Sequence, residues 1–359
     1  MAEPHIELNI TGTKFAATEL KPKSTVVKWW AKIFVYSFLV IAGQSAAVLL
    51  GRLYYDKGGK SEWLSTLVQV AGFPVFLPFY FFLPANKDQQ QPQPNMALKL
   101  VAIYIILGLL FASDCMLYSI GLLYLPVSTY SLICASQLAF NALFAFILNK
   151  QKFSPYIVNS LVILTISSTL LVFQPEPATK AVTHRQYILG FICTVAASVL
   201  FGFILPLTQL AYDRVIKRDD FKVILDMLVY QNLVATCATL IGLFASGEWK
   251  TLHGEMKGYE LGSTSYVMTL VWIALSWQIF AFGSLKLITL LSSLFSNVIG
   301  TLGLPVVPVL AVVIFQDKMN GIKAVAMVLA IWGFVSYAYQ YYADQDSSNK
   351  RKQPEPLTA

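Results

Sequence analysis

Long apolar runs separated by short polar segments dominate this chain. The run from Leu98 to Asn149 is too long for one membrane span, which needs about 20 residues. Leu125-Pro126 lies inside it, and proline both removes a backbone donor and disfavours helix at the residue before it. The pattern therefore predicts a helical hairpin that folds back at Leu125-Pro126. A second run, Ser265 to Phe315, is interrupted at Gly283-Ser284-Leu285-Lys286 and predicts a second hairpin.

The remaining apolar runs complete a set of ten predicted membrane-spanning helices. Pro74 and Pro78 break the second of these helices. The polar ends, 1–28 and 343–359, are predicted to be disordered tails, and the proline-containing segment 174–186 is predicted to link two halves, 29–173 and 187–342. The spans have the approximate bounds 29–50, 63–85, the two arms of the first hairpin, 154–173, 187–210, 224–245, 265–285, 287–315 and 321–342.

The two halves of the chain resemble each other where a fourth span ends and a fifth begins. Residues 147–154 and 313–320 are the corresponding stretches. Because five is odd, the second half must enter the membrane from the opposite face. The expected fold class is therefore an all-α integral membrane protein with ten transmembrane helices in two inverted five-helix repeats. A binding site is expected between the repeats, near the membrane midplane.

Composition and charge support a membrane location and give an orientation. The chain is 56% hydrophobic and only 13% charged, whereas soluble domains are about a quarter charged. Of the 26 Lys and Arg residues, 17 fall on the side that holds both termini. By the positive-inside rule both termini are cytoplasmic, and the net charge of +7 reports topology rather than nucleic-acid binding.

Asp114 is the most informative single residue, because it lies well inside an apolar span. A carboxylate in a bilayer is expensive, so it is expected to face a cavity or a partner and to have a functional reason. A desolvated carboxylate also takes up a proton readily, which suits a proton-coupling group. The structural alternative is a carboxylate that hydrogen-bonds a neighbouring residue such as Tyr118, one turn along.

Other polar or aromatic residues inside the spans are candidates for substrate binding. Tyr130, Gln137 and Asn141 share one helical stripe. Amides such as Gln137 can pair with the edge of a nitrogen heterocycle, although small and amide residues also hold membrane helices together. Mid-span tryptophans suit stacking on a flat ligand or simple packing. The candidate set is Gln44, Tyr118, Tyr130, Gln137, Asn141, Trp272, Trp277, Gln278, Ser293 and Asn297.

The sequence gives no sign of catalysis or of a bound cofactor. The three histidines lie in separate polar segments, and the four cysteines lie in apolar segments without metal-ligand spacing. No nucleophile elbow, phosphate loop or dinucleotide fingerprint occurs. Neither a cofactor nor a metal is expected, and the scarcity of charge inside the spans argues against polyanionic substrates.

Four stretches carry a resemblance to a known family. They are Gly43-Gln44 with Leu50-Gly51-Arg52-Leu53-Tyr54-Tyr55 through Gly58-Gly59, then Leu125 to Leu132, Ser246-Gly247-Glu248-Trp249, and Ser292 to Val298. Together they resemble the plant purine permeases, a branch of the drug/metabolite transporter superfamily. The resemblance implies transport of adenine-like bases and cytokinins, commonly with proton coupling. It also implies alkaloids or ring-containing vitamins as alternative substrates.

Several alternatives stay open at this point. A seven-helix receptor would need termini on opposite faces, an intramembrane enzyme would need catalytic groups, and an uncoupled facilitator would need no proton carrier. The expected partners are a small-molecule substrate, protons and the lipid bilayer, without nucleic acid. The expected location is the plasma membrane, with an endomembrane as the alternative. The sequence does not define the oligomeric state.

Overall fold

The computed structural model describes most of the membrane-spanning part of the chain. The described residues are 23–82, 94–125, 130, 133–134, 136–151, 154–170, 183–217, 220–303 and, between 321 and 339, residues 321–322, 324–325, 328–329, 331–337 and 339. The regular elements within these ranges are all helical. This part of the chain confirms the predicted all-α class.

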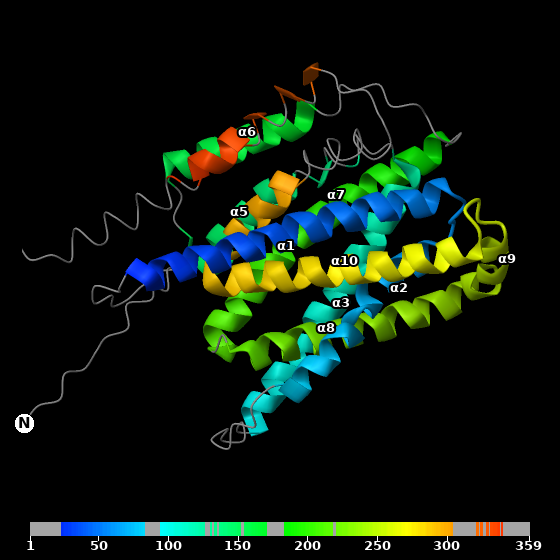
Figure 1. Ribbon diagram of the computed structural model, residues 1–359, viewed down its shortest axis with the longest axis horizontal. Helices are drawn as coiled ribbons and strands as arrows, with labels where there is room; N and C mark the ends of the chain where they lie inside the picture. Colours follow the sequence, from blue (N-terminus) through cyan, green and yellow to red (C-terminus); the bar gives the residue numbers. More distant parts are fainter. Residues whose placement is uncertain are drawn as a thin grey trace, which may run out of the picture.

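The helices run in both directions through one bundle (Figure 1). A further helical segment covers residues 293–303. The labelled elements are α1 (Lys23–Asp56), α2 (Glu62–Ala71), the 3-10 helix η1 (Phe73–Phe82), α3 (Pro94–Tyr124), α5 (Gln137–Asn149), α6 (Pro155–Leu170), α7 (His184–Ala211), the π-helical turn η3 (Tyr212–Ile216), α8 (Phe221–Ser246), the 3-10 turn η4 (Glu248–Lys250), α9 (Leu252–Lys257) and α10 (Ser263–Leu290).

Six helical stretches in the described residues are long and apolar enough to cross a membrane. They are α1, α2 with η1, α3, α7 with η3, α8 and α10. The apolar helices at 137–149 and 157–167 are shorter. The integral membrane class is therefore supported, whereas the count of ten spans and the inverted repeats stay predictions.

Two predicted boundaries are wrong. Residues 23–28 belong to α1 rather than to a disordered tail, and α7 begins at His184 rather than after a linker that ends at residue 186. At α7 the reason is a capping box, in which Thr183 Oγ1 accepts from the Gln186 backbone and Gln186 Oε1 accepts from the Thr183 backbone. Polar residues can thus start a helix before the apolar run begins. Residues 1–22, 174–182 and 343–359 lie outside the described residues.

The prolines of the second span act as predicted. The α-helix α2 ends at Ala71, and the chain continues as the 3-10 helix η1 with Pro78 inside it. The predicted hairpin tip agrees with the end of α3 at Tyr124, although Pro126 itself lies outside the described residues.

The predicted interruption at Gly283 to Lys286 is wrong, because α10 continues to Leu290 and the turn falls at 291–292. Glycine serves close packing here instead of breaking the helix. A Cβ at Gly283 would lie 2.9 Å from the Tyr36 carbonyl oxygen, and one at Gly43 would lie 2.7 Å from the Phe280 backbone nitrogen. The backbones of α1 and α10, one from each half of the chain, therefore touch along their lengths (Figure 1).

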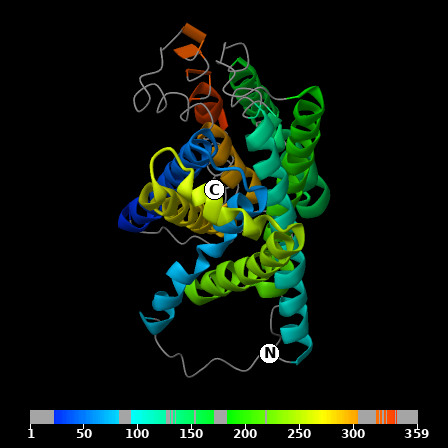
Figure 2. The same cartoon turned by 90° about the vertical axis from the view of Figure 1, so that its right-hand side faces the viewer.

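The other helices pack against one another and against α10. The helix α2 packs against α3, α8 and α10, while α7 packs against both α3 and α5 (Figure 2). The segment 293–303 contributes Leu294 and Val298 to a buried cluster with Val40 of α1 and Leu138 of α5. Helical residues between 321 and 339 lie beside α6. A small interior space lies between α1, α2, α3 and α10.

Candidate functional site

A small cavity lies between α1, α2, α3 and α10. Its volume is about 20 Å³, enough for about one water molecule, whereas organic ligands occupy pockets of a few hundred Å³. A ligand of that size therefore fits here only if the surrounding helices move apart. Its walls are formed by Ala47, Val48, Gly51, Ser65, Gln69, Tyr118, Ser119, Leu122, Tyr130, Ile273 and Trp277.

Three predicted site residues, Tyr118, Tyr130 and Trp277, line this cavity. The rings of Tyr118 and Tyr130 meet edge to face with centroids 6.0 Å apart. The thiol-bearing side chain of Cys134, which is 5% exposed, packs against both tyrosines. Aromatic faces of this kind suit a planar ligand.

The polar wall of the cavity comes from residues that the sequence analysis did not single out. Gln69 Nε2 donates to Ser119 Oγ at 2.9 Å and to the Ser65 carbonyl at 3.2 Å. The hydroxyl of Thr66 lies 3.1 Å from the same Ser119 Oγ. Ser65 and Gln69 are one turn apart on α2, a spacing that places both on one face, but that spacing alone does not show which helix they face.

A second set of predicted residues lies next to the cavity and is connected to it through Tyr118. The Tyr118 hydroxyl donates to Gln137 Oε1 at 2.9 Å, and Asn297 Nδ2 donates to the Gln137 carbonyl at 3.3 Å. Asn141, one turn after Gln137 on α5, donates to the Gly202 carbonyl of α7. We call Gln44, Gln137, Asn141 and Asn297 the amide layer. Gln44 joins it from α1, with Oε1 3.4 Å from where a Cβ on Gly300 would lie.

Several oxygens in and near this layer accept no hydrogen bond within the described residues. They include Gln44 Oε1, Asn141 Oδ1, Gln278 Oε1 and Asn297 Oδ1, all fully buried. A buried polar atom without a partner costs about 1–3 kcal/mol, so each needs an explanation. Predicted residue Ser293 is buried here too, where its backbone nitrogen donates to Gln209 Oε1 at 2.8 Å.

Asp114 lies on α3, one turn before Tyr118, and is 2% exposed. The structural alternative is a hydrogen bond to a neighbouring span, with Tyr118 as the example. Within the described residues the Tyr118 hydroxyl donates to Gln137 Oε1 and not to Asp114. Asp114 Oδ1 is buried and has no hydrogen-bond partner among the described residues. The carboxyl group is thus enclosed next to the cavity wall without a salt bridge from the described part of the chain.

Trp272 is the predicted site residue that the structure places elsewhere. Its side chain is 53% exposed on the outer face of α10, beside Met268 and Val271. Five residues of α-helix turn the side-chain direction by about 140° relative to Trp277. The prediction that both tryptophans line one cavity is therefore wrong for Trp272. Gln278 is buried and donates to the Gln69 carbonyl at 3.2 Å.

A separate polar cluster joins the two halves at the end of the bundle where α9 lies (Figure 1). Glu255 Oε1 accepts from the hydroxyls of Tyr54, at 2.5 Å, and Tyr266, at 2.9 Å. Glu255 Oε2 accepts from the Ser61 backbone. Glu248 Oε2 accepts from Ser61 Oγ and from the Trp63 backbone. We call Tyr54, Ser61, Glu248, Glu255 and Tyr266 the clasp.

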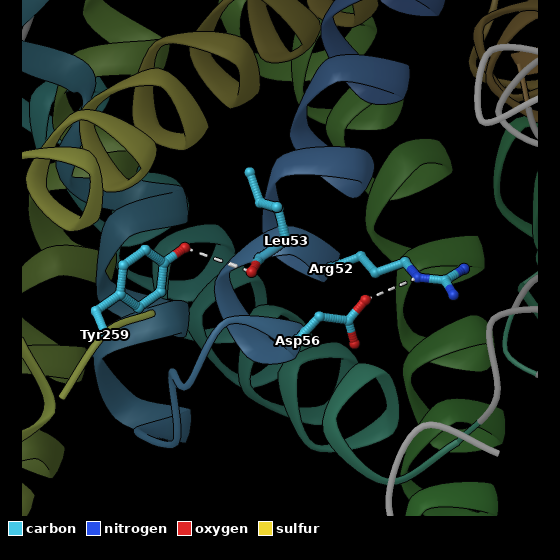
Figure 3. A network of polar contacts seen from close by, with 4 residues as sticks. All are labelled: Arg52, Leu53, Asp56 and Tyr259. Atoms are coloured by element: carbon cyan, nitrogen blue, oxygen red, sulfur yellow. Dashed lines mark hydrogen bonds and ion pairs between the residues drawn. The ribbon is translucent and has the colours of Figure 1, made fainter. Parts of the chain in front are cut away.

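The chain next to the clasp is fixed by further contacts, of which Figure 3 shows two. Tyr259 Oη donates to the Leu53 carbonyl, and Arg52 forms an ion pair with Asp56 at 3.2 Å. The Lys57 ammonium lies 2.9 Å from Glu260 Oε2, and this hydrogen bond raises the pKa of Lys57. The segment 246–263, which the sequence predicts as a connecting loop, is therefore an ordered structural element.

The described residues contain no group of three or more His, Cys, Asp or Glu side chains placed to hold a metal ion. The four cysteines are free, with Cys115, Cys134 and Cys193 buried and Cys237 exposed. What the interior offers a ligand is aromatic surface, amides and hydroxyls. An apolar helical bundle with such an interior is typical of a membrane protein that moves a small, uncharged molecule.

Comparison with known proteins then identifies the family. A family model described as purine nucleobase transmembrane transport matches residues 31–347. Purine permease 21 of Arabidopsis thaliana is 55% identical over 330 residues, 91% of this chain and 85% of its own length. Probable purine permease 10 of the same plant is 55% identical over 333 residues, with the same coverage. The chain belongs to the purine permease family, which consists of transporters and not enzymes.

The family membership confirms the resemblance that the four sequence stretches indicate. It also agrees with a multi-pass membrane protein. One solved crystal structure shares the fold at a TM-score of 0.55 and 15% identity, covering 89% of this chain and 98% of its own. At that identity the similarity concerns the fold alone.

Proposed function

We propose that this protein carries purine nucleobases and related nitrogen heterocycles, such as adenine and cytokinins, across a membrane. The observation that supports this most directly is the cavity enclosed by α1, α2, α3 and α10. Its wall combines the aromatic side chains Tyr118, Tyr130 and Trp277 with the polar side chains of Gln69 and Ser119. Alkaloids or vitamins with similar rings are the alternative cargo, since the same surfaces would accept them.

The lining chemistry favours a neutral, planar ligand. No Lys, Arg, Asp or Glu is among the residues that form the cavity wall in the described structure, so a polyanionic ligand would find no compensating charge. Stacking on Trp277 would supply most of the contact area, and hydrogen bonds to the amides would set the orientation. The small volume implies that the surrounding helices separate when cargo enters.

The transport cycle that we propose uses ten spans in two inverted repeats, 29–173 and 187–342, with both termini in the cytoplasm. Residues 174–186 include the connection between the repeats. We propose the plasma membrane as the location, with an endomembrane as the alternative. Support comes from the distribution of Lys and Arg and from the backbone contact between α1 and α10, one helix from each proposed repeat. In this orientation the clasp lies on the non-cytoplasmic side.

Asp114 is the proposed proton-coupling group. It is enclosed, lies one turn from the cavity residue Tyr118, and has an oxygen without a hydrogen-bond partner among the described residues. Protonation would remove its charge and lower the free energy of the states in which the site is shut off from water. If Asp114 is structural, the alternative is a facilitator without coupling.

Uptake of radiolabelled adenine by yeast cells that produce the protein tests the function. Trp277→Ala should lower uptake by roughly tenfold or more, because it removes the largest aromatic surface of the cavity. Trp272→Ala is the matched control on the same helix and should leave uptake unchanged at equal protein abundance. Equal effects of the two substitutions would show that the cavity is not the site, and the absence of saturable uptake of any purine would refute the function.

A further inference from the structure

The side-chain amide of Gln69 has a fixed orientation. One of its terminal atoms lies 3.2 Å from the Ser65 carbonyl oxygen and 2.9 Å from Ser119 Oγ. A backbone carbonyl can only accept a hydrogen bond, so the atom that faces it must be the NH2 group. Both N–H bonds of Gln69 are then directed at oxygens of the protein itself.

The group that Gln69 can still offer the cavity is the oxygen of its side-chain amide, Oε1. Gln69 lines the cavity, and none of its hydrogen bonds within the described residues involves Oε1. A free glutamine usually presents both a donor and an acceptor and can pair with adenine at two positions. Here the donor is occupied, so the group recognises only a ligand that donates.

In three other buried amides the nitrogen is likewise occupied and the oxygen is left over. Gln278, Asn141 and Asn297 each donate Nε2 or Nδ2 to a backbone carbonyl, and each leaves its own oxygen without a partner in the described structure. The Gln278 hydrogen bond ends on the Gln69 carbonyl and so also fixes the Gln69 backbone. These amides therefore present acceptors rather than donors.

We propose that Gln69 is a specificity-determining residue that accepts a hydrogen bond from an exocyclic N–H of the cargo, and that Ser119 is its positioning residue. This inference rests on the proposed function and narrows its substrate class to planar heterocycles with an amino N–H at the recognised edge. A ring with a carbonyl oxygen at that edge would place two acceptors against each other, which is repulsive.

Competition against labelled adenine uptake provides the test, with a series that changes only the donor. N6-methyladenine keeps one N–H, N6,N6-dimethyladenine keeps none, and hypoxanthine replaces the amino group by a carbonyl. In the unmodified protein the first should compete nearly as well as adenine. The other two should compete roughly five- to tenfold less well, as expected for one net hydrogen bond.

Gln69→Met keeps the length of the side chain but removes the acceptor, so the half-inhibitory concentrations of adenine and N6,N6-dimethyladenine should converge. Ser119→Ala removes one of the two oxygens that hold the Gln69 NH2 group and leaves the Ser65 carbonyl in place, so the preference should fall without disappearing. A purely structural role of Ser119 would lower uptake of every base equally. Gln231→Met, on α8 and outside the cavity wall, is the matched control and should keep the full preference.

The outcomes separate this inference from the function on which it rests. Unchanged discrimination in Gln69→Met, or equal competition by adenine and N6,N6-dimethyladenine in the unmodified protein, overturns the role of Gln69 while saturable adenine uptake still supports the transporter. A protein that takes up no purine refutes the function itself. If Gln69→Met does not reach the membrane, the series in the unmodified protein and in Ser119→Ala decides the question.

Discussion

The clasp and the amide layer bury polar groups in opposite ways. In the clasp both carboxylate oxygens of Glu255 accept hydrogen bonds, from the hydroxyls of Tyr54 and Tyr266 and from the backbone of Ser61. In the amide layer the side-chain nitrogens of Asn141 and Asn297 donate to backbone carbonyls, while oxygens such as those of Gln44 and Asn297 are buried without a partner in the described structure. Saturated and unsaturated clusters thus lie in the same bundle.

The difference agrees with a structural role of the clasp and with the functional role proposed for the interior residues. A satisfied buried cluster stabilises the fold and its geometry, and the clasp joins residues of the first half to residues of the second. Unpaired acceptors destabilise the fold by about 1–3 kcal/mol each, so their presence favours a role in which something else donates to them. Variants of the amide layer and its surroundings should therefore change transport, and variants of the clasp should change stability.

The largest expected effect is that of Asp114→Asn on uphill transport. Because asparagine mimics the protonated carboxyl, the variant should keep binding and exchange but lose concentrative uptake and its pH dependence. Stability should change little, since Asp114 Oδ1 has no partner to lose within the described residues. Accumulation ratios measured across a pH series test this.

Asp226→Asn is the control for Asp114, because the Asp226 carboxylate accepts from the Tyr80 hydroxyl at 2.7 Å and is thus paired. It should retain concentrative uptake. Normal, pH-dependent accumulation in Asp114→Asn would make Asp114 structural and the protein a facilitator or a carrier with another coupling group.

In the clasp, Glu255→Ala should lower the free energy of unfolding by about 2–4 kcal/mol. It removes three hydrogen bonds to a carboxylate and leaves the hydroxyl of Tyr54, a residue 1% exposed, without an acceptor. The midpoint of thermal unfolding of the detergent-solubilised protein should fall by several degrees, while the affinity for substrate in the surviving protein is kept.

Glu260→Ala is the matched control for the clasp, since Glu260 lies on the same segment but pairs with the exposed Lys57. Its unfolding midpoint should equal that of the unmodified protein. Equal shifts in Glu255→Ala and Glu260→Ala would show that the clasp contributes no more than a surface ion pair.

Close helix packing can be separated from both polar clusters with a glycine pair. Gly43→Ala would place a Cβ 2.7 Å from the Phe280 backbone nitrogen and 2.8 Å from the Ser276 carbonyl. Neither backbone atom can move alone, so α1 and α10 must separate, at about 1–3 kcal/mol. Gly254→Ala in α9 meets no atom of the described residues within 4 Å and should be neutral or slightly stabilising. Thermal unfolding of the two variants tests the difference.

The smallest expected effect concerns the ion pair next to the clasp. The hydrogen bond to Glu260 raises the pKa of Lys57, so any stabilisation from this pair is fully present below the ordinary lysine pKa of about 10.4. It is lost as the pH rises through the raised value. In an NMR titration Glu260→Ala should return the pKa of Lys57 toward the ordinary range, and an unchanged pKa would contradict the assigned cause.

Much of the fold could be predicted from sequence because a bilayer limits the choices. Backbone groups in lipid must be satisfied within a helix, so the long apolar runs correctly indicate α1, α3, α7, α8 and α10. The errors occur where one residue type serves two purposes. Gly283 lies in a stretch whose composition is typical of a turn, but its lack of a side chain allows α1 and α10 to touch.

The site was harder to predict, because a helix that is apolar on all sides does not reveal which face points inward. Trp272 and Trp277 are equally prominent in the sequence, yet only Trp277 lines the cavity. Gln69 and Ser119 are ordinary polar residues of their own spans. Their importance depends on the packing of α2 against α3, which no single-sequence periodicity reports.

Cys134 gives this protein a built-in chemical probe of cavity opening. Its side chain is 5% exposed and packs against Tyr118 and Tyr130, two residues of the cavity wall, so it lies behind that wall. A small maleimide should therefore modify it slowly. When the surrounding helices separate, the alkylation rate should rise, and bound cargo should slow it again by shielding the thiol. With Cys115, Cys193 and the exposed Cys237 replaced by serine, the rate would report opening at Cys134 without any introduced cysteine.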